Sequence, residues 1–571
     1  MDIPFELTSA IKSALKSLGI EATDVVLEHP ADMSHGDYAT NVALAFSKQL
    51  QVNPRELGEK LAAALRARNI PFVERIDVAG PGFINFHVSR ATLSKGIEEI
   101  LKRTYRYGTG NLWRNTKVLI EYTDPNPFKE FHIGHLMANA IGESLARLIG
   151  SHGAKVRRMC YQGDVGMHVA KAMWAIMRRG KLPSRLSPLK ERIAFIGSCY
   201  VEGSKAYEED AVAKVEIEAV NKAVFEGKDR KLMKAYKRGR RWSLSHFEDI
   251  YRELGTKFNY YVLESEVIHD GVAIVNEFLD KGVFEKSEGA VVFKGEKYDP
   301  SLHTRVFINS QGLPTYEAKE LGLNTRKWKR MAPDRSIIVT ANEQSDYFRV
   351  VLKALELVNP AARKATEHIS HGMLRFASGK MSSRTGNVIT GESLIRDVEA
   401  MVAEKLKDRD ISESKKEKIA SIIAVAAIKY SILKQVTSSD IIYDFEKSIS
   451  FEGDSGPYLL YTAVRASSVL AKAKSEKIKP VVSVTVPATA LEKLLVRYPE
   501  TVERAAIEKA PHLLAGYLIE TAAAFNSWYA NTIIVKKDEP ESPHRVAVAA
   551  ATRVVIENGL DLLGMKVPDE M

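Results

Sequence analysis

The chain has 571 residues, more than one compact core usually holds, so we expect several domains. Its formal net charge of +10 at pH 7 favours contact with polyanions, although so modest an excess can also serve solubility alone. No leader-like start and no run of about 18 apolar residues occurs, so we expect no membrane contact. The two cysteines, Cys160 and Cys199, are too few for a disulfide framework or a four-cysteine zinc site. We therefore expect a cytoplasmic protein without a protein-bound structural metal.

The amino-terminal stretch, residues 1–110, has the pattern of a small α+β domain. Apolar residues recur at helical spacing in three segments, followed by two short β-type runs around Gly80-Pro81-Gly82. The three helical segments are 7–18, 39–50 and 57–65, and the β-type runs are 76–78 and 83–88.

The middle stretch, residues 111–400, begins with a buried-strand run at 118–122 and a turn-rich loop. A helix at 134–150 and a second strand at 156–161 follow, which makes a βαβ unit and predicts a Rossmann-type parallel sheet. Residues 175–265 are polar, basic and helical in pattern, so we expect an insertion there. Further β-type runs occur at 290–293, 305–308 and 336–340.

The carboxy-terminal stretch, residues 401–571, is almost wholly helical in pattern. The predicted fold class is therefore a multidomain α/β protein. It has a Rossmann-type parallel-sheet domain between an α+β amino-terminal domain and an all-α carboxy-terminal bundle.

A candidate nucleotide site lies in the segment 124–135, between the first strand and helix of the βαβ unit. His132 and His135 begin the helix, where free N–H groups and the helix dipole favour phosphates. Gly134 permits close approach of a base or ribose to the backbone. The two histidines can donate hydrogen bonds to phosphate oxygens as charge develops. By itself, His-Ile-Gly-His could also be a chance tetrapeptide or a pair of capping residues.

A second candidate motif is the loop 376–388, in which two glycines flank Lys380, Met381 and Ser382. Such a loop can fold over a triphosphate and bring a cation to it, although an isolated Lys-Ser cluster is more often a solvated surface loop. The two motifs in this order and about 250 residues apart resemble the pair found in class I aminoacyl-tRNA synthetases. That resemblance implies an adenylation site with His132, His135 and Lys380 as catalytic residues.

Further segments resemble one branch of that class, the arginyl-tRNA synthetases. Segments 36–41 and 78–85 resemble that family's amino-terminal domain, and 456–461 and 558–564 resemble its anticodon-binding helical domain. The match spans nearly the whole chain and is weak only in 175–265. It implies ligation of L-arginine to tRNA(Arg) through an arginyl-adenylate, with ATP entering as its Mg²⁺ complex.

The resemblance and the chemistry of the guanidinium group together select the arginine-binding candidates, since a guanidinium needs carboxylates and planar acceptors. These candidates are Glu121, Asp124, Asn126, His135, Tyr316, Glu320 and Gln344. The ATP-binding candidates are His132, Gly134, His135, Lys380, Met381 and Ser382.

Five positions depart from the family pattern, and one of them is Val165, where a tryptophan is usual. Glu320 stands where an aspartate is usual, Asp124 where a small residue is common, and Ser383 where the second motif often has lysine. Lys129, before the first motif, is a catalytic candidate because it can compensate for that missing lysine. His168 stands where a glutamine is usual, and the sequence leaves the role of this histidine open.

For tRNA, Tyr458, Tyr461 and Arg465 could supply stacking and phosphate contacts, although both tyrosines could equally pack in the core of the helical bundle. We expect a monomer. Two alternatives remain open: another class I synthetase such as a cysteinyl or glutamyl type, and a synthetase-like protein that binds tRNA without catalysis. Intact His132, His135 and Lys380 argue against the second.

Overall fold

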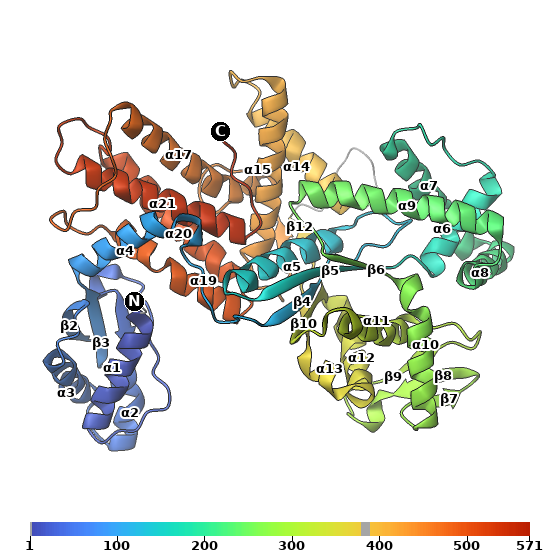
Figure 1. Cartoon of the computed structure of the whole chain (residues 1–571), viewed down its shortest axis with the longest axis horizontal. Coiled ribbons are helices and arrows are strands. Elements are labelled where there is room, and N and C mark those ends of the chain that lie inside the picture. The colour runs from blue at the N-terminus through green and yellow to red at the C-terminus, as the bar shows by residue number, and fades with distance from the viewer. Residues whose placement is uncertain (1–2, 378–388) are drawn as a thin grey trace. The chain divides into compact units, whose positions relative to one another are not determined.

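The computed structural model describes residues 3–377 and 389–571. They form two compact units, each made of several chain segments (Figure 1). Unit 1 consists of Met1–Tyr107, Thr462–Glu500 and Glu520–Asn558. Unit 2 consists of Gly108–Tyr461, Thr501–Ile519 and Gly559–Met571.

The amino-terminal part of unit 1 is an α+β module, as predicted. A three-stranded antiparallel sheet has the order β1-β3-β2, and helices pack against it. Its elements are α1 (Ile3–Ser17), β1 (Tyr38–Thr40), α2 (Val42–Leu50), α3 (Pro54–Ala67), β2 (Val73–Ala79), β3 (Phe83–Val88) and α4 (Arg90–Arg103). Leu7, Ile11, Leu61 and Phe86 are fully buried in its core. The β2–β3 hairpin needs glycine at Gly82, where φ is +134° and a Cβ atom would lie 2.6 Å from the carbonyl oxygen of Pro54.

The centre of unit 2 is a five-stranded parallel sheet of order β11-β10-β4-β5-β6, which confirms the Rossmann-type prediction. The strands are β4 (Lys117–Glu121), β5 (Lys155–Gln162), β6 (Tyr260–Leu263), β10 (Arg335–Ala341) and β11 (Thr366–His371). Helix α5 (Ile133–Ser151) connects β4 to β5 and packs on both strands (Figure 1). Because all five strands are parallel, their carboxyl ends lie at one edge of the sheet.

Between β5 and β6 the chain forms a helical layer with a core of its own. It consists of α6 (Met167–Arg179), α7 (Leu189–Glu209), α8 (Ala211–Glu226) and α9 (Arg230–Glu253). Trp174, Ile196, Ile217 and Trp242 are buried in that core. The long helix α9 runs beside α6 and α7 in Figure 1.

After β6, a smaller layer completes the sheet domain. It contains α10 (Glu264–Asp280), β7 (Glu285–Ser287), β8 (Ala290–Lys294), β9 (Thr304–Ile308), α11 (Tyr316–Met331), α12 (Ser345–Val358) and α13 (Pro360–Ala365). Strands β7, β8 and β9 form an antiparallel sheet, and α10 packs along α11.

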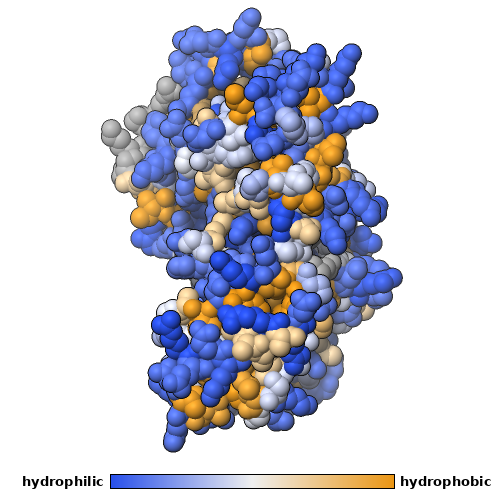
Figure 2. Space-filling model, turned by 90° about the vertical axis from the view of Figure 1, so that its left-hand side faces the viewer, coloured by the Kyte–Doolittle hydropathy of each residue, from blue (hydrophilic) through white to orange (hydrophobic). Residues whose placement is uncertain are grey.

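The remaining chain is mainly helical, as predicted. It comprises β12 (Leu374–Phe376), α14 (Gly391–Lys405), α15 (Glu413–Leu433), β13 (Ile441–Tyr443), α16 (Phe445–Ser448), α17 (Gly456–Ser475), α18 (Ala490–Val496), α19 (Tyr498–Ile507), α20 (Pro511–Asn531) and α21 (Ser542–Leu562). Strands β12 and β13 pair in parallel. None of the helices in the described part of the chain combines the length and apolar character needed to span a bilayer. On the face drawn in Figure 2, hydrophobic side chains form small separate groups among hydrophilic ones, as is usual for a folded protein's surface.

Candidate active site

The first motif lies where β4 ends and α5 begins, at the carboxyl edge of the parallel sheet. His132 is the N-cap of α5, and it exchanges hydrogen bonds with His135. The backbone N–H of His132 donates to His135 Nδ1 at 3.2 Å, and the backbone N–H of His135 donates to His132 Nδ1 at 3.4 Å. The two rings stack with centroids 3.4 Å apart. Because both Nδ1 atoms accept, each neutral ring carries its proton on Nε2 and can donate it to a ligand.

The surroundings keep both histidines neutral. Loss of hydration and, second, the charge of Lys129 lower the pKa of His132 to about 4. Burial lowers the pKa of His135 well below its ordinary value, and His132 and Lys129 add to this effect. The ammonium group of Lys129 lies 5.5 Å from the ring centroid of Tyr200.

Helix α9 holds the loop that leads into this motif. The backbone N–H of Phe128 donates to the Ser243 hydroxyl at 3.1 Å, and the Phe128 ring stacks on Tyr236 with centroids 6.0 Å apart. A Cβ atom at Gly239 would lie 2.5 Å from the Phe128 ring, so the helix needs glycine there. The basic helical layer thus positions the loop before the first motif, a role that the sequence did not reveal.

The second motif lies outside the described residues, so Lys380, Met381 and Ser382 are not located. The chain that follows it is located beside the first motif. Thr390 forms a β-bridge with His132, and the backbone N–H of Gly391 donates to the Phe131 carbonyl at 2.8 Å. The described chain at Thr390 and Gly391 therefore lies next to His132 and Phe131.

A buried charged cluster lies on the other side of the β4 carboxyl end. Lys327 contacts Glu121 at 2.5 Å and Glu320 at 3.7 Å, while Lys319 contacts Glu264 at 2.5 Å. All five residues are at most 7% exposed. Burial raises the pKa of Glu320 to about 7, against the lowering effect of Lys327. Burial also raises the pKa of Glu264, and the charge of Lys319 opposes that rise.

The loops after β4 and β5 meet next to this cluster. A Cβ atom at Gly163 would lie 2.2 Å from Asn126 Oδ1 and 3.3 Å from Glu264 Oε1, so Asn126 lies against the backbone at the end of β5. Asp124 accepts a hydrogen bond from the backbone N–H of Tyr161 at 2.6 Å. Burial, followed by the charge of Glu121, raises the pKa of Asp124. Asp124 is therefore anchored to β5 through its carboxyl group.

His168 has a structural contact that answers the question left open by the sequence. Its Nε2 atom lies 2.7 Å from the Gly163 carbonyl, and burial lowers its pKa to about 4. A neutral His168 therefore donates from Nε2 and fixes the turn after β5.

Tyr316 and Gln344 border the same region. The Tyr316 ring is contacted by the Lys319 ammonium group at 4.3 Å, and its hydroxyl lies 3.9 Å from where a Gly166 Cβ atom would be. Gln344 is exposed in a short 3₁₀ turn directly after β10, the strand next to β4. The sheet order brings Gln344 to this edge.

The sequence analysis missed Glu264, Lys319, Lys327, Tyr161 and Tyr347 in this region. Glu264 follows directly after β6, and the four-residue run Tyr260–Leu263 was the available signal. This run lies within the stretch 175–265, which we expected to be a helical insertion, so we did not identify it as a strand. Lys327 lies seven residues after Glu320, on the same face of α11, which the helical period could have indicated.

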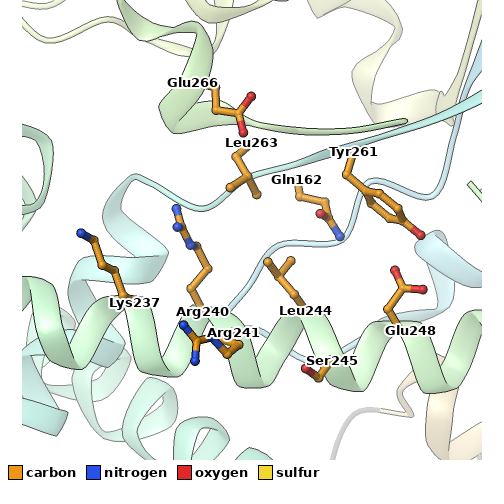
Figure 3. A pocket seen from close by; sticks show the side chains of 10 residues that line it. All are labelled: Gln162, Lys237, Arg240, Arg241, Leu244, Ser245, Glu248, Tyr261, Leu263 and Glu266. Atoms are coloured by element: carbon orange, nitrogen blue, oxygen red, sulfur yellow. The ribbon is translucent and has the colours of Figure 1, made fainter. Parts of the chain in front are cut away.

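A separate pocket of about 490 Å³ opens between α9 and the ends of β5 and β6 (Figure 3). Lys237, Arg240 and Arg241 lie at one end, and Glu248 and Tyr261 at the other. Arg240 pairs with the buried Asp164 at 2.6 Å. The exposed Lys237 and Arg241 make that end of the pocket suitable for an anionic group.

The remaining candidates lie on α17. Tyr458, Tyr461 and Arg465 are all partly buried. Arg465 donates to Asn526 Oδ1 at 2.6 Å and lies 4.8 Å from the ring centroid of Tyr529. Among residues 3–377 and 389–571, no group of three or more His, Cys, Asp or Glu side chains is placed to hold a metal ion.

Three family models match successive parts of the chain. The model for the catalytic domain of class I tRNA synthetases of the R type matches residues 96–445. The arginyl tRNA synthetase N-terminal domain matches residues 6–88, and the DALR anticodon-binding domain matches residues 459–571.

Whole-chain relatives agree with these matches. The chain is 30% identical over 559 residues to the arginine–tRNA ligase of Clostridium acetobutylicum, covering 97% of each chain. It is also 30% identical over 578 residues to that of Clostridium botulinum, covering 100% of each. Its fold matches the Thermus thermophilus arginyl-tRNA synthetase with a TM-score of 0.79 and 24% identity over 99% of both chains. The Plasmodium falciparum enzyme matches with a TM-score of 0.76 and 19% identity, over 100% of this chain and 99% of that one. This chain belongs to the arginyl-tRNA synthetases of class I.

Proposed function

We propose that this chain activates L-arginine with ATP and transfers it to tRNA(Arg), using the groups at the carboxyl ends of β4, β5 and β10. The observation that carries this proposal is the pairing of two sites across the end of β4. On one side, two neutral histidines offer Nε2 donors at the start of α5, and on the other lies a buried acidic cluster. The first suits a triphosphate and the second a guanidinium group.

In the first step, the arginine carboxylate attacks the α-phosphorus of ATP, and pyrophosphate leaves. His132 and His135 donate hydrogen bonds to phosphate oxygens, and the Lys129 ammonium group offsets the developing negative charge. Gly134 leaves room for the nucleotide, since among the described residues a Cβ atom there would meet only the His132 ring, at 3.1 Å. Lys380, Met381 and Ser382 would complete the site from the segment that precedes Ile389, where the described chain resumes. ATP enters as its Mg²⁺ complex, with the ion held mainly by triphosphate oxygens.

Arginine occupies the acidic side of the site. Glu121 and Glu320 provide its carboxylates, and Asp124 lies next to them. Asn126, His135 and Gln344 hold its α-amino and α-carboxylate groups, and Tyr316 borders its side chain. The extra methylene of Glu320, relative to aspartate, is accommodated on the buried face of α11.

In the second step, the 2′-hydroxyl of the terminal tRNA adenosine attacks the carbonyl of the adenylate. The protein needs no nucleophile of its own for this step. Cys160 is buried, and burial raises the pKa of its thiol, so it is a structural residue. Tyr458, Tyr461 and Arg465 contact the anticodon stem and loop, while Lys237 and Arg241 offer further phosphate contacts.

The deciding experiment is ATP–pyrophosphate exchange with each of the amino acids, with and without tRNA. We expect exchange with arginine only, and only when tRNA(Arg) is present. Exchange with a different amino acid would identify another class I synthetase. Absence of exchange with any amino acid, while tRNA still binds, would support the non-catalytic alternative.

We also propose that the chain acts as a monomer in the cytoplasm. The two free cysteines, both buried, are consistent with a reducing compartment. Light scattering coupled to gel filtration should give the mass of one chain, 63.5 kDa. A mass of twice that value would contradict the monomer.

A further inference from the structure

The ammonium group of Lys129 has an aromatic neighbour in place of a carboxylate. It lies 5.5 Å from the ring centroid of Tyr200, and within residues 3–377 and 389–571 no carboxylate forms an ion pair with it. The face of an aromatic ring attracts a cation through its quadrupole, whereas a carboxylate would also neutralise the cation. Lys129 is therefore held by an interaction that leaves its full positive charge available to a ligand.

The charge of Lys129 acts on histidines that follow two neighbouring strands of the main sheet. Burial, followed by this charge, lowers the pKa of His132 to about 4. Burial also lowers the pKa values of His135 and His168, and Lys129 adds to the effect on each. His132 and His135 begin α5, and His168 lies in the first turn of α6. Lys129 is therefore within electrostatic reach of the place where we propose that the triphosphate binds.

Tyr200 reaches this place from α7, in the helical layer between β5 and β6. A close contact fixes α7 against α6, since a Cβ atom at Gly203 would lie 2.0 Å from the Lys171 carbonyl oxygen. Tyr200 precedes Gly203 by three residues, and residues at that spacing share a face of a helix. Burial, together with nearby acidic groups that include Tyr200, raises the pKa of Tyr316 to about 12. Tyr200 is therefore close both to Lys129 and to a tyrosine that borders the arginine side of the site.

Helix α9 of the same layer holds the preceding residue in a different way. The backbone N–H of Phe128 donates to the Ser243 hydroxyl at 3.1 Å, and its ring stacks on Tyr236. These contacts fix the backbone immediately before Lys129. They leave the lysine side chain free to move, because its ammonium group sits on a flexible four-carbon stem. The contact with Tyr200 restricts that stem.

Resting on the proposed function, we propose that Tyr200 is a positioning residue for adenylate formation, which holds the Lys129 ammonium group beside the first motif and leaves its charge free for the triphosphate. Restricting the lysine before ATP arrives reduces the conformational entropy that is lost on binding. The uncancelled charge then offsets the negative charge that develops on the phosphate oxygens. The helical layer, whose role the sequence left open, thus contributes to the reaction through Lys129.

Three substitutions of Tyr200 separate the holding of Lys129 from the preservation of its charge. Tyr200→Phe keeps the ring face and should leave kcat/KM for ATP within about twofold of the wild type. Tyr200→Leu removes the attraction of the ring and should lower that value about threefold to tenfold. Tyr200→Glu holds the ammonium group in an ion pair but cancels its charge, so the loss should exceed that of Tyr200→Leu. Pyrophosphate exchange with arginine and tRNA(Arg) present is the measurement, and the arginine KM should change by less than about twofold.

The double variant Lys129→Ala/Tyr200→Leu is the decisive one. A residue that acts only through Lys129 has nothing left to position once that side chain is removed. The double variant should therefore remain within about twofold of Lys129→Ala. Tyr207→Leu is the matched control on the same helix, because the Tyr207 ring lies 4.7 Å from the Lys171 ammonium group and 5.5 Å from that of Lys214. It removes an equivalent contact away from the first motif and should leave kcat/KM for ATP within about twofold of the wild type.

Four results would overturn the inference. The first is a Tyr200→Leu chain with the kcat/KM of the wild type, and the second is a Tyr200→Glu chain that is more active than Tyr200→Leu. The third is a Lys129→Ala chain as active as the wild type, which would leave Tyr200 no charge to hold. The fourth is a double variant that falls as far below Lys129→Ala as Tyr200→Leu falls below the wild type, because that result would indicate a general effect on the packing of α7.

Thermal unfolding establishes that each variant is folded at the assay temperature. If Tyr200→Leu is not, Tyr200→Met takes its place in the single and the double variant, because the flexible methionine side chain fills irregular space. A wild-type chain that shows no exchange with arginine and tRNA(Arg) would refute the proposed function itself. Normal exchange by the wild type, with any of the four results above, would refute only this inference.

Discussion

At the scale of single residues, the first turn of α5 fixes the chemical state of its two histidines. Backbone N–H groups occupy both Nδ1 atoms, and desolvation together with Lys129 disfavours a second proton on either ring. Both rings consequently remain hydrogen-bond donors through Nε2 without becoming cations. Among the described residues at the start of α5, the cation is Lys129, which the sequence analysis had suggested as compensation for Ser383.

Lys129→Ala tests that suggestion. Removing a cation that acts on the developing phosphate charge should lower the rate of adenylate formation about tenfold or more. Lys214→Ala is a matched control, since Lys129 and Lys214 each lie 5.5 Å from the centroid of a tyrosine ring, and Lys214 is exposed on α8. Pyrophosphate exchange in the presence of tRNA is the measurement. A rate for Lys129→Ala within about twofold of the wild type would contradict the compensation idea.

His168 should make stability depend on pH in a defined window. Its pKa is lowered to about 4 in the folded chain, so the unfolded chain binds a proton first as the pH falls below about 6.5. The stabilisation is complete above that value and is lost between about pH 6.5 and pH 4, with a maximum of about 3 kcal/mol. His168→Gln lacks the titrating group, so urea unfolding should show a smaller loss over this window. Equal losses in the two proteins would show that His168 is not the group responsible.

The sequence identified the residues whose roles depend on local motifs, and missed those whose roles depend on pairing across elements. His132, His135 and Asn126 follow a strand end that periodicity alone locates. Lys327 matters because α11 brings it to Glu121 of β4, and no motif records that contact. Buried counter-ions of this kind become visible only when the sheet and its covering helices are assembled.

At the scale of elements, the packing of α5 on β4 determines how accurately the first motif is placed. Gly142, in the middle of α5, allows the ring of Tyr122 to lie against the helix backbone, since a Cβ atom there would be 2.3 Å from that ring. The Tyr122 hydroxyl then donates to Glu143 at 2.6 Å, and Arg147 and Arg158 pair with the same carboxylate. One glycine thus permits a buried network that joins β4, α5 and β5.

Gly142→Ala should therefore destabilise unit 2 by about 1–3 kcal/mol through overpacking, although alanine favours helices. Gly150→Ala in the same helix is the control. Its Cβ atom would make only an ordinary contact, 3.7 Å from Val156, so this change should be neutral or stabilise by up to about 1 kcal/mol. Thermal unfolding of both variants is the measurement. Equal melting temperatures would show that α5 can move away from Tyr122 without cost.

Most elements were predictable because apolar residues recur in them at regular helical spacing, as in α1 and α3. Strand β6 was not, because four residues between helical segments give too short a pattern. The stretch 175–265, which we expected to be a helical insertion, therefore contains both the helical layer and β6, an edge strand of the main sheet. Domain limits at 110 and 400 remain a proposal.

At the scale of the whole molecule, each compact unit combines segments that are distant in the sequence. In unit 1, Asp37 of the amino-terminal module pairs with Lys493 of α18 at 3.1 Å, and Arg90 pairs with Glu492 at 2.6 Å. Asp37 is only 3% exposed and also accepts the backbone N–H of Val88 at 2.8 Å. The segment 36–41, singled out by its resemblance to the family, therefore has a structural role in attaching this module to α18.

Lys493→Met should consequently destabilise unit 1 by about 1–3 kcal/mol, because Asp37 remains buried without its cation. Adding Asp37→Asn should recover part of that loss by removing the uncompensated charge. Lys474→Met, an exposed position on α17, is the control and should change stability by less than about 0.5 kcal/mol. Chemical unfolding gives all three values. An equal loss in Lys493→Met and Lys474→Met would indicate that the pair contributes nothing.

The pairing of Asp37 with Lys493 also has a consequence during synthesis on the ribosome. The amino-terminal module emerges first, and its core residues lie mainly between Leu7 and Leu93, so it can collapse early. Its ionic partners are translated hundreds of residues later, after a delay on the order of tens of seconds. During that interval, Asp37 and Arg90 lack the partners that Lys493 and Glu492 provide in the folded chain, so the hydrophobic core of the module carries more of its stability. Any product that terminates before α18 never acquires Lys493 and Glu492. We therefore expect such incomplete chains to be degraded faster by cellular proteases than the full chain.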